Sequence, residues 1–133
     1  MWQDFKDYIL SEIAGREVKI AEIAVGRFPQ IADELSGYDN ITVIKTDILP
    51  ADDTVIKDDV TNPDLNLYRD TDIIYSIRPP SELQPHIADL AVKVGSQLII
   101  KPLTNEDLNT GRVKMKLKNY NRASFYILRC FDE

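Results

Sequence analysis

The chain has 133 residues, of which 44% are hydrophobic and 29% are charged, and its formal net charge is −6. This composition is typical of a globular protein, and we expect residues 1–133 to form a single domain that buries about two thirds of its unfolded surface. The one cysteine, Cys130, and the one histidine, His86, exclude an internal disulfide and a zinc site of clustered Cys and His ligands.

The sequence has no feature of a membrane or secreted protein. It contains no run of about 18 apolar residues, the length that would span a bilayer. Its N-terminal residues 1–13 carry acidic side chains where a signal peptide would be basic and then apolar. We therefore expect a cytoplasmic protein.

Charge is distributed unevenly along the chain. Residues 1–100 carry 9 basic and 18 acidic side chains, a net charge of −9, whereas residues 101–133 carry a net charge of +3. The acidic part argues against broad contact with nucleic acid. The basic C-terminal part needs a separate interpretation.

A helix, a buried strand and a second helix are predicted at the start of the chain. Apolar side chains at spacings of three and four mark the first helix: Trp2, Phe5, Ile9 and Ile13. Residues 18–25 are a short apolar run typical of a central parallel strand, and Gly26 follows them. Pro29 and Gly37 then bound a helix of about two turns.

The alternation of strands and helices continues beyond residue 40. Residues 41–48 predict a second strand and residues 54–59 a third, but a parallel crossover normally needs more residues than lie between them. Either a bare loop makes this crossing, or the third strand is short and irregular. The later predicted elements are a helical turn at 61–68, a strand at 72–77, a helix at 81–95 and a strand at 96–103.

The end of the chain predicts a β-hairpin. Residues 113–118 and 123–131 alternate between apolar and polar side chains, and the residues between them have the composition of a hairpin connection. The complete pattern predicts an open α/β fold with a mainly parallel sheet. Counted in chain order, its strands are expected in the order 3-2-1-4-5, with the antiparallel hairpin beyond strand five.

Several stretches together resemble a small, uncharacterised archaeal protein family with the Rossmann-like fold of class I S-adenosylmethionine-dependent methyltransferases. These stretches are EIAVGRFP, TDILP, KDDV, DIIYSIRPP, LIIKPL and the closing hairpin. The resemblance covers nearly the whole chain. It implies a methyltransferase-like fold and allows S-adenosylmethionine, or a related adenosyl ligand, as the cofactor.

The resemblance assigns cofactor binding to the loop after the first strand. The first methyltransferase motif has an acidic residue followed by glycines at alternate positions, and the matching residues here are Glu22, Ala24, Gly26 and Phe28. Only the middle glycine is present. A dinucleotide needs three glycines to seat its pyrophosphate, whereas a sulfonium amino acid has no phosphate and tolerates a looser turn. Phe28 either packs beneath the second helix or fills the ligand's space, and the loop can equally be an empty tight turn.

Two acidic residues follow the next strands. Asp47 ends the second strand and lies 21 residues after Gly26, near the spacing at which a Rossmann acid binds ribose hydroxyls. Its alternative role is that of a cap in a polar loop. Asp59 matches the position that often contacts the adenine amino group, and its alternative is an ordinary loop residue. Asp58 beside it is expected to be solvated.

Arg78, Pro79 and Pro80 lie where amino-methylating enzymes carry a polar residue and two prolines before an aromatic ring. Here arginine replaces the polar residue and Ser81 replaces the ring, which disfavours methylation of a nucleobase amine. Arg78 instead suits an anion, either a carboxylate or phosphate of a substrate or the adenosyl ligand's own carboxylate. Its alternative is an ion pair with Asp47 or Asp59.

A row of basic residues marks the predicted hairpin: Arg112, Lys114, Lys116 and Lys118. Their alternation places them on one face of a strand, with Val113, Met115 and Leu117 facing the core. Such a row most often keeps an edge strand from pairing with other chains. The rival interpretation is a contact surface for RNA.

The sequence thus supports two classes of function. The first is a minimal methyltransferase that binds an adenosyl ligand at the mouth of the sheet. The second is a non-catalytic module that senses a nucleotide or joins a complex, with RNA binding through the basic hairpin as a variant. Neither the oligomeric state nor the methyl acceptor follows from the sequence, and no metal site is expected.

Overall fold

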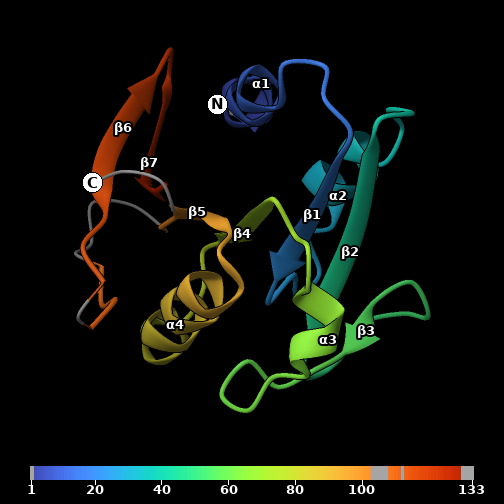
Figure 1. Ribbon diagram of the computed structural model, residues 1–133, viewed down its shortest axis with the longest axis vertical. Helices are drawn as coiled ribbons and strands as arrows, with labels where there is room; N and C mark the ends of the chain where they lie inside the picture. Colours follow the sequence, from blue (N-terminus) through green and yellow to red (C-terminus); the bar gives the residue numbers. More distant parts are fainter. Residues whose placement is uncertain (1, 103–107, 112, 130–133) are drawn as a thin grey trace.

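The computed structural model describes residues 2–102, 108–111 and 113–129. Its centre is one seven-stranded sheet in the order β3-β2-β1-β4-β5-β7-β6 (Figure 1). The strands are β1 (Val18–Ile23), β2 (Ile41–Asp47), β3 (Ile56–Lys57), β4 (Ile73–Ile77), β5 (Gln97–Lys101), β6 (Lys116–Tyr120) and β7 (Ala123–Leu128). β1 to β5 pair in parallel, whereas β7 runs antiparallel to both β5 and β6. The predicted order 3-2-1-4-5 and the C-terminal antiparallel hairpin are both confirmed.

Helices cover both faces of the sheet (Figure 1). They are α1 (Trp2–Ile13), α2 (Gln30–Leu35), α3 (Leu65–Tyr68) and α4 (Gln84–Val94), with a 3-10 turn η1 (Ser81–Leu83) before α4. One core cluster joins α1 and α2 to the first face, and a second joins α3 and α4 to the opposite face. We call these the α1 face and the α4 face.

The central strands are apolar because both of their faces are covered. Along β1, Ile20 packs in the core of the α1 face, while Ala21 and Ile23 pack in the core of the α4 face. All five residues of β4 are buried. The continuous apolar runs in the sequence, in place of a simple alternation, are therefore explained by the two layers of helices.

The first helix forms over the predicted residues and packs by its predicted stripe. Phe5, Ile9 and Ile13 are almost completely buried on the α1 face. The Phe5 ring contacts the rings of Tyr75 on β4 and Phe125 on β7 edge to face. This helix thus ties the hairpin to the parallel part of the sheet. No helix among residues 2–102, 108–111 and 113–129 has the length and apolar character needed to cross a membrane.

Strands β3 and β6 differ clearly in extent from their predicted ranges. β3 has two residues, which pair in parallel with Thr46 and Asp47, so the third strand is short and a bare loop makes the crossing. β6 begins at Lys116 rather than at residue 113. The turn of the hairpin lies at Asn121 and Arg122, where Asn121 has a φ of 53°, a left-handed conformation that asparagine tolerates.

Candidate functional site

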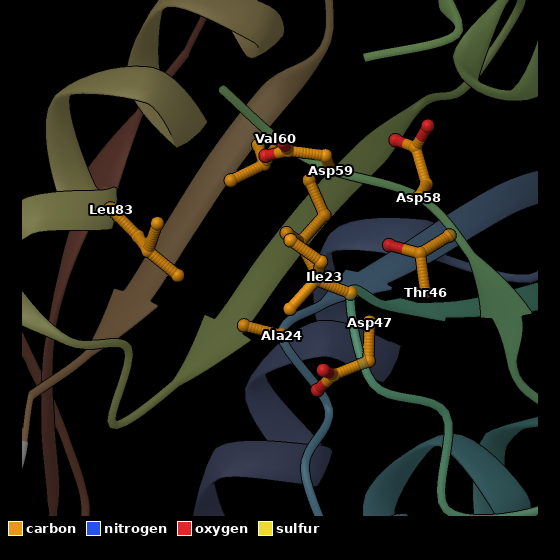
Figure 2. Close-up of a pocket in the computed structure, with 9 residues that line it drawn as sticks. Ile23, Ala24, Thr46, Asp47, Asp58, Asp59, Val60 and Leu83 are labelled. Atoms are coloured by element: carbon orange, nitrogen blue, oxygen red, sulfur yellow. The ribbon is translucent and has the colours of Figure 1, made fainter. Parts of the chain in front are cut away.

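A cleft opens at the carboxyl ends of the parallel strands, where ligands bind in open α/β sheets. It has a larger lobe with a volume of about 410 Å³ beside Gly26, Phe28 and Arg78. A smaller lobe of about 50 Å³ lies between the ends of β1 and β2 and the loop after β3 (Figure 2). Four residues line both lobes: Ala24, Asp47, Ile48 and Leu83. The two lobes therefore adjoin, and together they have the size of a small-molecule site.

The loop after β1 keeps a glycine-like backbone although one of its glycines is replaced. Ala24 has a φ of 57° and Gly26 a φ of 60°, both left-handed. A left-handed alanine costs roughly 1 kcal/mol relative to glycine. β1 ends at Ile23, two residues before the predicted limit, because the chain turns at Ala24. The loop therefore retains a strained shape that brings its backbone to the cleft.

Asp47 holds two loops together at the centre of the cleft. Its Oδ2 accepts a hydrogen bond from the backbone N–H of Gly26 at 2.8 Å, and its Oδ1 accepts one from the N–H of Leu49 at 2.9 Å. Figure 2 shows Asp47 and Ala24 among the residues that line the smaller lobe. The side chain thus has the predicted alternative role of a loop cap. Each oxygen accepts one bond, and a carboxylate has room for about four.

The loop after β3 contributes Asp59 to the smaller lobe. Asp59 Oδ1 accepts hydrogen bonds from both the hydroxyl (2.7 Å) and the backbone N–H (2.9 Å) of Thr61. Both bonds lower the pKa of Asp59 below its usual value, and the bond from the hydroxyl has the larger effect. The carboxylate is therefore charged near neutral pH and is fixed at the rim of the lobe.

Asp58 is not the solvated residue that the sequence predicts. Its Oδ2 accepts a hydrogen bond of 2.7 Å from the hydroxyl of Tyr68, which is completely buried. That hydroxyl also lies 3.0 Å from Oγ1 of Thr46 at the end of β2. Asp58 Oδ1 accepts a further bond from the N–H of Asp64. Asp58 takes part in these contacts because Tyr68, the last residue of α3, packs next to the loop after β3.

Glu22 lies beneath the cleft rather than in its wall. Its side chain is on the α1 face and is 1% exposed, between Lys45 of β2 and Tyr75 of β4 in the strand register. Burial raises the pKa of Glu22 to about 8; the nearby Tyr75 hydroxyl and the Lys45 charge oppose this shift, and Asp33 adds to it. Glu22 Oε1 and the Tyr75 hydroxyl have no hydrogen-bond partner of good geometry. Lys45 is itself paired with Asp33 at 2.9 Å.

Arg78 makes neither of the two predicted ion pairs in the part of the chain that the structure describes. Its guanidinium lies 5.1 Å from the ring centroid of Trp2, a cation–π contact. The Trp2 ring also contacts Phe28, at a centroid distance of 5.2 Å. Arg78, Phe28 and Pro80 line the larger lobe, whereas Pro79 is buried. Phe28 thus contacts α1, packs against the core cluster that includes α2, and lines the larger lobe.

The basic row on the hairpin differs from the prediction. Lys116 and Lys118 share one face of β6, but Leu117 is 57% exposed, so the expectation that it faces the core is wrong. Lys118 Nζ lies 5.9 Å from the ring centroid of Tyr8 on α1. Lys114 precedes the strand. Arg112 lies outside the described residues.

Several residues of the cleft were not predicted from the sequence. Leu83 and Ile48 line both lobes, and Trp2 lies behind the larger one. Ile48 and Leu49 are 51% and 78% exposed. Two adjacent apolar residues directly after a strand that ends in an acid are a signal that could have placed Ile48 at the site. Among the described residues, no three His, Cys, Asp or Glu side chains are grouped so as to hold a metal ion.

Comparison with known proteins identifies a matching family, curated relatives and solved structures with a similar fold. The sequence model of the "Uncharacterised protein family (UPF0146)" matches residues 2–130. A UPF0146 protein of Methanothermobacter thermautotrophicus is 41% identical, over 95% of this chain and 93% of its own length. A UPF0146 protein of Archaeoglobus fulgidus is 35% identical, over 92% of this chain and 91% of its own length.

Three solved structures, two of them named as methyltransferases, share the fold at low sequence identity. The precorrin-6y C5,15-methyltransferase of Geobacter metallireducens superposes with a TM-score of 0.61 and 13% identity, covering 94% of this chain and 86% of its own. An S-adenosyl-L-methionine methyl transferase of Silicibacter pomeroyi gives 0.59 and 10%, with 96% and 91% covered. A mutant of MtNAS in complex with S-adenosylmethionine gives 0.56 and 13%, with 97% and 63% covered.

Proposed function

Since the chain belongs to the UPF0146 family, we propose that it binds S-adenosylmethionine or a related adenosyl ligand as a minimal methyltransferase. Its methyltransferase-like fold and the cleft at the carboxyl ends of its parallel strands support this proposal. The observation that carries this proposal is the conformation of the loop after β1. Ala24 keeps a φ of 57° where the methyltransferase motif has glycine. Strain of this kind is retained where the surroundings, and often a function, demand it.

The residues of the cleft fit the parts of an adenosyl ligand. Asp47 has unused acceptor positions on both oxygens, which suit ribose hydroxyls. Asp59 uses Oδ1 for Thr61 and leaves Oδ2 for an amino group at the smaller lobe. Ile23, Val60 and Leu83 provide apolar walls for a planar ring. The combined lobes are large enough for such a ligand.

Methyl transfer requires little acid–base chemistry from the protein. When bound, S-adenosylmethionine supplies an activated methyl group on its sulfonium. The residues of the larger lobe would then orient the acceptor and exclude water, because Ala24, Phe28 and Ile77 present apolar surface there. Positioning of this kind can lower a barrier by several kcal/mol without a general base.

A non-catalytic binding module is the second candidate, and a specific observation favours it. The carboxylates of Asp47 and Asp59 already hold loops of the protein itself. A site whose acids are used in this way can serve as a rigid receptor for a nucleotide without catalysing a reaction. Both candidates place the ligand in the same cleft.

Isothermal titration calorimetry with S-adenosylmethionine and S-adenosylhomocysteine tests the proposal. We expect saturable binding, weakened about tenfold to a hundredfold in Asp47→Asn, because bonds to a charged acceptor are worth about 1.5–3 kcal/mol. Asp72→Asn is the matched control, since Asp72 accepts the N–H of Lys19 at 2.9 Å but lies outside the cleft. No heat at millimolar ligand would exclude the proposed function.

A further inference from the structure

Lys101, the last residue of β5, is a buried cation. It is 8% exposed. Its ammonium makes no ion pair or side-chain hydrogen bond with any residue that the structure describes. Lysine is seldom buried so deeply without a partner, because the desolvated charge is costly. We therefore expect that this buried charge serves a function, because its desolvation destabilises the folded protein.

Arg78 is a second cation at the same end of the sheet. Its backbone N–H donates to the carbonyl of Lys101 at 2.7 Å, and its neighbour Ile77 is the register partner of Lys101. Arg78 has a φ of 54°, a conformation that is strained for any residue with a side chain. The backbones of the two cations are thus joined directly.

The two side chains lie on the same face of the sheet. Along β5, Ile99 packs on the α1 face, and Lys101, two residues later, points to that face too. The Arg78 guanidinium lies over Trp2 of α1. Burial lowers the pKa of Lys101, and the charge of Arg78 lowers it further, as expected when two cations are close.

We propose that Arg78 and Lys101 together bind the oxyanion, carboxylate or phosphate, of a molecule that occupies the larger lobe of the cleft. The guanidinium offers a planar pair of donors, the ammonium adds a compact charge, and Trp2 fixes the guanidinium from behind. Arg78 lines that lobe; Lys101 does not line it, but its register partner Ile77 does. The inference rests on the proposed function for the identity of the molecule, but the anion site can be tested without any adenosyl ligand.

Anion binding is measured first on the free protein by titration with sodium acetate and with inorganic phosphate at constant ionic strength. The probes are the NMR signals of the Arg78 Nε–H and of the Lys101 side-chain methylenes. We expect the chemical shifts to change saturably at millimolar concentrations of at least one of the two anions. Lys101→Met, which fills the same buried space without the charge, should weaken this binding at least fivefold. Lys93→Met on the exposed side of α4 is the matched control and should not change it.

The stability of Lys101→Met separates a binding role from a structural one. Removal of an unpaired buried charge should raise the Tm, whereas the loss of a structural partner would lower it. Linear shifts without saturation, equal affinities in the wild type and Lys101→Met, or a lower Tm in that variant would overturn the proposal.

A second titration identifies the molecule that carries the anion. The acetate titration is repeated with S-adenosylhomocysteine and with 5′-methylthioadenosine, which lacks the carboxylate. If only the first displaces acetate, the site holds the adenosyl ligand's own carboxylate; if acetate binds to both complexes, the site belongs to the acceptor. Either result supports the anion site. Acetate binding without any adenosyl binding would contradict the proposed function and leave the anion site standing.

Discussion

Replacing Glu22 by glutamine should stabilise the protein and change the way its stability depends on pH. Glu22 is 1% exposed, and burial raises its pKa from 4.5 to about 8. The folded protein therefore holds a proton on this carboxyl at pH values where the unfolded chain has released it. Glutamine has nearly the same shape and does not titrate.

The magnitude follows from proton linkage. Below pH 4.5 the carboxyl is neutral in both states, so it does not penalise folding there. From pH 4.5 to about pH 8 it lowers the free energy of unfolding by about 1.4 kcal/mol per pH unit, and above pH 8 the effect is constant. At pH 7 the accumulated loss is roughly 3 kcal/mol, and Glu22→Gln should recover most of it.

Urea unfolding of both proteins between pH 5 and pH 8.5 measures this effect. The stability of the wild type minus that of Glu22→Gln should fall steadily up to about pH 8 and then level off. Glu82→Gln, which removes one exposed carboxyl, controls for the change in net charge. Parallel curves for the wild type and Glu22→Gln would refute the reasoning, because the buried carboxyl would then carry no linked proton.

Three further substitutions test the loops, the polar contacts under the cleft and the hairpin. Ala24→Gly should raise the free energy of unfolding by about 0.5–1 kcal/mol in urea, because glycine adopts the left-handed conformation without strain. Ala88→Gly inside α4 is the control and should lower it by at least about 1 kcal/mol. Equal losses in the two variants would contradict the claim that Ala24 is strained. Tyr68→Phe should lower the free energy of unfolding by about 1–3 kcal/mol in the same assay, because Asp58 loses the buried hydroxyl that donates to it. An unchanged urea midpoint would contradict this contribution. Lys116→Thr on the edge strand β6 should increase light scattering at high protein concentration and leave RNA binding absent; salt-sensitive RNA binding by the wild type, lost in the variant, would show that the hairpin is a nucleic-acid surface.

Strand order and layers could be predicted from the sequence because they depend on hydrophobic periodicity. The apolar run at 18–25 has residues for both faces, which only a central strand requires. The limits of β6 could not be predicted in this way. Val113 and Met115 pack against the core of the α4 face before the strand begins, so the alternating pattern continues beyond the paired residues.

The site was predictable where neighbouring strands end, and less so where distant segments meet. Asp47 is the last residue of β2 and Gly26 follows the adjacent parallel strand β1, so their proximity follows from the topology. Arg78 and Trp2 are 76 positions apart, and no local pattern links them. Their contact depends on how α1 lies across the sheet, which propensities and spacing do not determine.

The carboxylate that joins the loops after β1 and β2 has a consequence for the thermodynamics of ligand binding. Because Asp47 holds Gly26 and Leu49 through hydrogen bonds within the chain, these loops become ordered when the protein folds. A ligand would therefore enter walls that are already in place, with little loss of backbone entropy and no slow rearrangement to limit its association rate. The heat-capacity change of binding should then reflect the apolar surface of the ligand and the cleft alone, without a contribution from coupled folding.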